Sequence, residues 1–108
     1  MTEIRIWIDD ERTPPDGWLW AKTPDAAIAA LRSPDVTTVS FDHDLGEDDS
    51  GKEFRVLDVL DWMRLTETWP QSVAVHSQNP VGANNIMRAL VHDGPYQQRT
   101  PRSVSRVA

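Results

Sequence analysis

The stretch VTTVSFDHDLG, residues 36–46, decides the fold class of this 108-residue chain. Its first six residues are rich in β-branched side chains, which favour an extended strand. The switch at Asp42 from apolar to acidic residues is typical of the end of a buried strand. We therefore predict a strand over 36–41 that delivers Asp42, His43 and Asp44 to one edge of a sheet.

The remaining elements follow from periodicity, capping residues and breakers. Thr23-Pro24 and Asn79-Pro80 each combine a preferred N-cap residue with proline at the first helical position. The tetrapeptide Ser50 to Glu53 matches a capping box and predicts a helix of about 14 residues. Further strands are predicted at 3–8, 18–21 and 72–75, and helices at 24–31, from 50 onward, and from 80 to 91.

Strands that alternate with helices predict an α/β fold with right-handed crossovers. We expect a three-layer, flavodoxin-like arrangement, with a mainly parallel sheet of four to five strands and helices on both faces. Residues 1–95 are predicted to form this domain. Residues 96–108 are a polar tail or an edge strand of the same domain.

The composition excludes several classes of function. The chain has no cysteine, so any metal must bind oxygen or imidazole ligands. Its net charge of −6 disfavours binding to duplex nucleic acid, although a small phosphorylated molecule or a nucleotide terminus can still be held locally. No stretch is long and apolar enough to cross a membrane, so we expect a cytoplasmic protein.

Three aspartates predict a metal site. Asp9 and Asp10 follow the strand at 3–8, and Asp42 follows the strand at 36–41. The carboxyl ends of parallel strands share one edge, where ligands of such sheets bind. Converging carboxylates repel one another, and a hard divalent cation such as Mg²⁺ relieves that repulsion while it binds phosphate oxygens. The alternative for each aspartate alone is a turn cap.

Two histidines reach the same edge. His43 follows the strand at 36–41 and His76 follows the strand at 72–75, so their imidazoles would flank a bound ligand. Such a pair can act as general acid and base on a phosphodiester at neutral pH. The alternative for either residue is a hydrogen-bonded turn histidine. His92, in the last turn of a helix, is interpreted as structural.

Four residues are candidates to hold phosphate oxygens: Arg12, Ser77, Asn79 and Asn84. The helix that begins at Pro80 presents free N–H groups to the edge, and Gly82 permits close backbone approach. Capping alone also explains Asn79. The acidic run 47–49 and the arginines of the C-terminal tail are interpreted as solvated charges.

Three blocks resemble the cyclic-phosphate processing receiver-like family of bacteria and phages. They are IDDERTP (residues 8–14), FDHDLG (41–46) and VHSQNPVGANNI (75–86), and the resemblance covers roughly residues 3–92. That family is similar to two-component receiver domains. The resemblance implies that Asp9 and Asp10 match the metal-binding acidic pair of receivers, that Asp42 matches their phospho-accepting aspartate, and that Ser77 matches their strand-ending hydroxyl residue.

The resemblance also shows departures from ordinary receivers. A proline-rich loop replaces the first receiver helix, and no strand-ending lysine is evident. The family resemblance implies an enzyme that processes a cyclic phosphate, and we expect a metal-assisted phosphoesterase with Asp42, His43 and His76 in catalysis. The alternatives are a non-catalytic receiver-like switch that is phosphorylated on Asp42, and a phage accessory protein that only binds a nucleotide.

Overall fold

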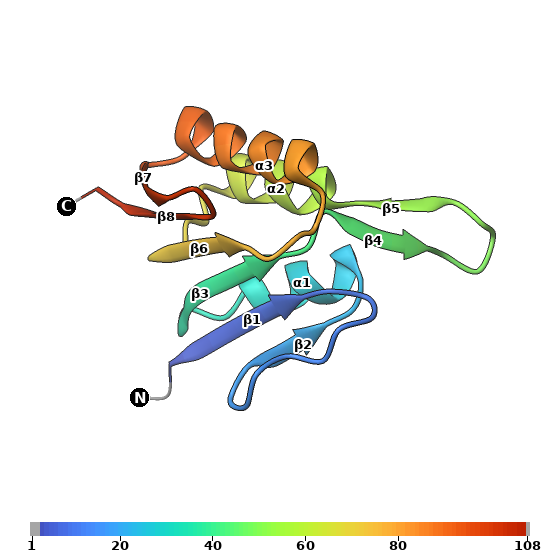
Figure 1. Ribbon diagram of the computed structural model, residues 1–108. Helices are drawn as coiled ribbons and strands as arrows, with labels where there is room; N and C mark the ends of the chain where they lie inside the picture. Colours follow the sequence, from blue (N-terminus) through green and yellow to red (C-terminus); the bar gives the residue numbers. More distant parts are fainter. Residues whose placement is uncertain (1–2, 108) are drawn as a thin grey trace.

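The computed structural model describes residues 3–107, which form one six-stranded sheet, one two-stranded hairpin and three helices (Figure 1). No helix in this range has the length and apolar character that spanning a membrane requires. In chain order the elements are β1 (Ile4–Ile8), β2 (Leu19–Ala21), α1 (Pro24–Leu31), β3 (Val36–Phe41), β4 (Asp44–Glu47), β5 (Glu53–Arg55), α2 (Val56–Thr66), β6 (Ser72–Val75), α3 (Pro80–Asp93), β7 (Tyr96–Thr100) and β8 (Ser103–Arg106).

The sheet has the order β2-β1-β3-β6-β8-β7, and its first four strands are parallel. This confirms the predicted receiver-like α/β fold with a mainly parallel sheet, although the sheet has six strands and not the four to five that were expected. Because β1, β3 and β6 are adjacent and parallel, their carboxyl ends lie along one edge. The two proline-containing helix starts are also confirmed: Thr23 accepts from the N–H of Ala26, and Asn79 accepts from the N–H of Gly82.

All three helices lie on one face of the sheet, whereas the sequence analysis expected helices on both. The buried apolar residues of the strands belong to one alternating set, which joins the helices in a single core, and α2 packs against both α1 and α3. Right-handed crossovers that step in one direction along a sheet place their helices on the same face. A second layer would need a helix between β1 and β2, where the chain has a proline-rich loop instead.

The predicted capping box at Ser50 to Glu53 is not a helix start. Helix α2 begins at Val56, and the preceding residues form the β4–β5 hairpin, which projects from the carboxyl edge of the sheet (Figure 1). The Asp48 carboxylate accepts hydrogen bonds from Ser50 N–H, Ser50 Oγ–H and Lys52 N–H, and Gly51 has a positive φ of 84°. These local bonds favour a turn over a helix cap.

The C-terminal residues described by the structure extend the sheet. Strands β7 and β8 form an antiparallel hairpin, and β8 pairs antiparallel with β6. Tyr96 is buried, and its hydroxyl donates to the Pro70 carbonyl at 2.6 Å. Residues 96–106 therefore complete the core and bring the turn between β7 and β8 to the carboxyl edge.

Candidate functional site

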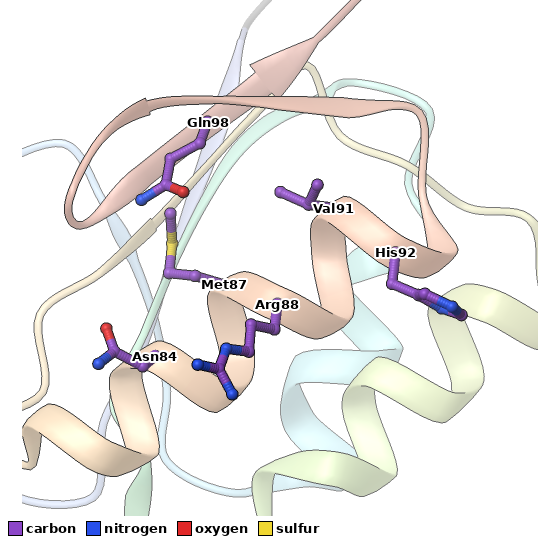
Figure 2. A pocket seen from close by; sticks show the side chains of 6 residues that line it. All are labelled: Asn84, Met87, Arg88, Val91, His92 and Gln98. Carbon is purple, nitrogen blue, oxygen red and sulfur yellow. The ribbon is translucent and has the colours of Figure 1, made fainter.

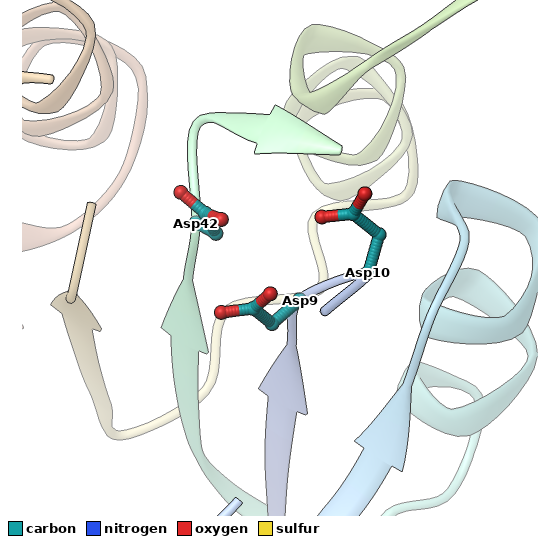
Figure 3. A group of neighbouring side chains, drawn as sticks. All are labelled: Asp9, Asp10 and Asp42. Atoms are coloured by element: carbon teal, nitrogen blue, oxygen red, sulfur yellow. The ribbon is translucent and has the colours of Figure 1, made fainter. Parts of the chain in front are cut away.

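Three aspartates meet at the carboxyl edge of the sheet. Asp9 and Asp10 directly follow β1, and Asp42 directly follows the neighbouring strand β3. One carboxylate oxygen from each lies within 4.8 Å of the others, and Figure 3 shows the three groups around a common space. The predicted convergence therefore follows from the adjacency of two parallel strands.

The Asp9 carboxylate is fully buried and firmly held. Its Oδ1 accepts from the backbone N–H groups of Glu11 and Arg12 at 2.9 and 3.0 Å, and its Oδ2 lies 3.0 Å from His76 Nε2. Burial alone would raise the pKa of Asp9, but these hydrogen bonds and the nearby imidazole lower it overall. Asp9 is therefore a fixed anion at neutral pH.

His76 lies behind Asp9 and uses both ring nitrogens in hydrogen bonds. Its Nδ1 is 2.7 Å from Ser40 Oγ, and its ring stacks on Trp7 with the centroids 3.7 Å apart. Burial lowers the pKa of His76, which keeps the imidazole neutral despite Asp9. The neutral tautomer that satisfies both contacts donates from Nε2 to Asp9 and accepts the Ser40 hydroxyl at Nδ1.

Asp42 and Asp10 are the less constrained carboxylates. Within residues 3–107, the Asp42 carboxylate accepts a single hydrogen bond, a long one of 3.4 Å from the Asp44 N–H. Burial and the charge of Asp9 raise the pKa of Asp42. The chain passes so close to Asp10 that a Cβ at Gly46 would lie 2.6 Å from Asp10 Oδ2, and Gly46 also has a positive φ of 77°. Glycine is therefore needed there.

These residues border a cleft of about 310 Å³ that opens beside the β4–β5 hairpin. Its donors are mainly oxygens, and the repulsion between the Asp9 and Asp42 carboxylates favours a bound cation. The residues present therefore fit a divalent metal, which prefers carboxylate ligands. The lining residues are Asp9, Asp10, Glu11, Arg12, Asp42, Asp44, Gly46 and Gln78.

His43 does not line this cleft. Its ring packs against the first turn of α3, where a Cβ at Gly82 would lie 2.3 Å from the imidazole. Its Nδ1 is 3.0 Å from Asp44 Oδ1, and Asp44 does line the cleft. The structure therefore places the two predicted imidazoles in different surroundings: His76 contacts Asp9 directly, and His43 connects to the cleft through Asp44.

The predicted phosphate-binding residues also separate. Arg12 lines the cleft, and its guanidinium donates to the His76 carbonyl at 3.2 Å. Ser77 is buried and accepts from the N–H of Asn79, which in turn caps α3.

Asn84 lies elsewhere, in an open groove of about 640 Å³ between α3 and β7 (Figure 2). The groove also contains His92, which was interpreted as structural, together with Met87, Arg88, Val91 and Gln98.

Several residues that support the site were not predicted to do so from the sequence. Ser40 and Trp7 hold the His76 ring, and Arg102 donates to the Ser77 carbonyl at 2.7 Å. Ser40 carried a usable signal, since it is a polar residue inside an otherwise buried strand end. Arg102 was interpreted as a solvated charge of the tail, which is wrong, because the turn between β7 and β8 brings it to the Ser77 carbonyl.

Comparison with known proteins gives one match. The family model described as the cyclic-phosphate processing receiver domain matches residues 4–92, which include β1, all three helices nearly to the end of α3, and every member of the aspartate cluster. No curated protein and no solved structure gives a significant match.

Proposed function

Since this chain belongs to the cyclic-phosphate processing receiver family, we propose that it is a divalent-metal-dependent phosphoesterase that opens a cyclic phosphate. The observation that carries this proposal is the convergence of Asp9, Asp10 and Asp42 within 4.8 Å beside an open cleft. Paired carboxylates with room for a ligand are a common basis of phosphate chemistry that needs a metal.

Asp9, Asp10 and Asp42 would hold the metal, with Mg²⁺ or Mn²⁺ as the expected ion. When bound, such an ion polarises phosphate oxygens and lowers the pKa of a coordinated water. The chain itself contributes preorganisation, because Asp9 is fixed by three hydrogen bonds before any ligand arrives. Arg12 lines the same cleft and would hold a phosphate oxygen.

The two histidines take different roles in this proposal. His76 is a positioning residue, since both of its ring nitrogens are engaged and its side chain is only 15% exposed. His43 is 32% exposed and is connected to the cleft through its hydrogen bond to Asp44, so in this proposal His43 would exchange protons with the cleft through the Asp44 carboxylate.

The test is hydrolysis of 2′,3′-cyclic and 3′,5′-cyclic mononucleotides with Mg²⁺, Mn²⁺ or EDTA. We expect metal-dependent turnover that Asp10→Asn and Asp42→Asn reduce by about 100-fold or more, as expected when a metal ligand is lost. The matched control is Asp58→Asn, which removes an exposed carboxylate of α2 and should retain activity. Equal turnover in the Asp42→Asn and Asp58→Asn proteins would refute the proposal.

A receiver-like switch is the second candidate. Asp42 ends the third strand of the chain's parallel sheet beside the acidic pair, which is the position of the phospho-acceptor that the sequence resemblance implied. Incubation with acetyl phosphate and Mg²⁺ separates the two functions. A stable phosphoryl adduct that Asp42→Asn abolishes, without turnover of any cyclic phosphate, would favour the switch.

A further inference from the structure

The sheet face opposite the helices is open and polar. Two rows of register partners cross it, and small polar side chains occupy most of the positions in the middle of the sheet. Their side chains are partly exposed, apart from Ser40. A face that packs on another protein is normally more apolar than this at its centre. The rows are Arg5-Thr38-Ser72-Ser105 and Trp20-Trp7-Ser40-Ala74-Ser103.

Aromatic side chains gather where this open face meets the aspartate cluster. Trp7 and Trp20 are register partners, and Trp18 meets Trp7 edge-on with the centroids 5.9 Å apart. All three indoles are partly exposed. Trp20 Nε1 donates to the Asp9 carbonyl at 2.7 Å, so this aromatic group directly adjoins the proposed metal site.

Several cationic side chains border the open face, although the whole chain is acidic. Arg5 lies in the first row and contacts Glu3, and Arg99 of β7 donates to Ser105 Oγ at 2.6 Å. At the aromatic end, the Lys22 ammonium lies 4.2 Å above the Trp20 ring. Arg12 and Arg102 donate to the carbonyls of His76 and Ser77, just past the end of β6. In a chain of net charge −6, this clustering favours an anionic ligand on this face.

We propose that the open face binds a single-stranded nucleotide chain whose terminal phosphate enters the aspartate cleft. Bases stack on exposed indoles without regard to sequence, and arginines at intervals along a sheet contact the backbone phosphates. This inference rests on the proposed function and names its substrate class: the end of an oligonucleotide rather than a free mononucleotide. An acidic peptide matches the charge of the face but offers nothing to stack on the indoles.

The experiment measures binding separately from chemistry. A fluorescein-labelled, eight-nucleotide single-stranded RNA with a 2′,3′-cyclic phosphate end is titrated with the full chain in EDTA, and anisotropy is recorded. Trp18→Ala is the stacking variant, because Trp7 and Trp20 also hydrogen bond to the backbone of the site. We expect about 10-fold weaker binding, the usual effect of losing one stacking side chain.

The charge test uses the double variant Arg5→Glu/Arg99→Glu, and its matched control is Arg64→Glu/Arg88→Glu on the exposed surfaces of α2 and α3. We expect the double variant to bind at least about 10-fold more weakly and with a shallower salt dependence, since it loses phosphate contacts. The control should bind like the wild type. A duplex of the same sequence, or a poly-glutamate peptide, should bind more weakly than the single strand.

This inference would be overturned if the wild-type chain did not bind the single strand detectably, or if both variants bound it as tightly as the wild type. Equal binding of poly-glutamate would overturn it too, because the face would then recognise charge alone. If mononucleotides are still hydrolysed while RNA does not bind, only the substrate class is wrong. If RNA binds as expected but no metal-dependent turnover occurs, the nucleotide-binding face stands and the phosphoesterase proposal fails.

Discussion

Asp9 is held by a chain of side chains that begins on the open face of the sheet. Ser40 contacts His76 Nδ1, and His76 Nε2 contacts Asp9 Oδ2. The stacked Trp7 ring prevents the imidazole from turning away. Residues behind a metal ligand commonly set its orientation, and we infer that His76 acts on the cation through Asp9.

His76→Ala should therefore weaken Mn²⁺ binding by about 10-fold or more, because Asp9 loses one of its three hydrogen bonds. Isothermal titration calorimetry measures the affinity directly. The matched control is Asn84→Ala, in the groove between α3 and β7, which should bind Mn²⁺ like the wild type. Unchanged affinity in His76→Ala would leave the residue with a structural role alone.

Asp42 is expected to lower the stability of the metal-free protein. Its folded-state pKa is raised by burial and by Asp9, so its ionised form destabilises the metal-free fold. That cost is absent below the ordinary value of 3.8 and fully present above the raised folded-state pKa. Asp42→Asn should therefore increase the free energy of unfolding at pH 7 in EDTA, and this gain should disappear as the pH falls below 3.8.

Urea denaturation at the two pH values measures this difference. A loss of stability at pH 7 in Asp42→Asn would show that Asp42 is instead a stabilising carboxylate.

The sequence could predict that the aspartates converge, because strand ends fix their positions. It could not predict the hydrogen-bonded state of His76, since that depends on Ser40 and Trp7 across two other strands.

Among the secondary-structure elements, the β4–β5 and β7–β8 hairpins were not predicted, for different reasons. Ser50 to Glu53 matches a capping box, but Asp48 supplies competing local bonds that form the β4–β5 turn. For the tail, an edge strand was one of two alternatives, because polar residues such as Gln97, Gln98 and Arg99 gave no clear periodic signal. Strand β7 is an edge strand in which every residue after Tyr96 is exposed, and its pairing with β8 comes from the sheet rather than from local preference.

Tyr96→Phe tests whether the tail hairpin is part of the folded core. The change removes the 2.6 Å hydrogen bond to the Pro70 carbonyl and leaves that buried carbonyl without its partner. We expect a loss of about 1–3 kcal/mol in the free energy of unfolding, because the carbonyl stays desolvated. Chemical denaturation gives the value, and a change below about 0.5 kcal/mol would mean that the hairpin is only loosely attached.

At the scale of the whole molecule, the chain is a receiver-like sheet with its helices on one face. The alternation of strands and helices was enough to predict the parallel sheet and the edge that carries the site. The number of helical layers on the sheet was harder to predict, because it depends on which connections between strands contain a helix. Without a helix between β1 and β2, the second face stays open beside the aspartates.

A divalent cation at the aspartate cluster is the central requirement of the proposed function. Mn²⁺ titration followed by electron paramagnetic resonance should detect a site in the wild type that Asp10→Asn/Asp42→Asn abolishes. The matched variant Asp58→Asn/Asp61→Asn on α2 removes the same charge and should retain that site. Mn²⁺ binding that survives in the first double variant, or is absent from the wild type, would contradict the account.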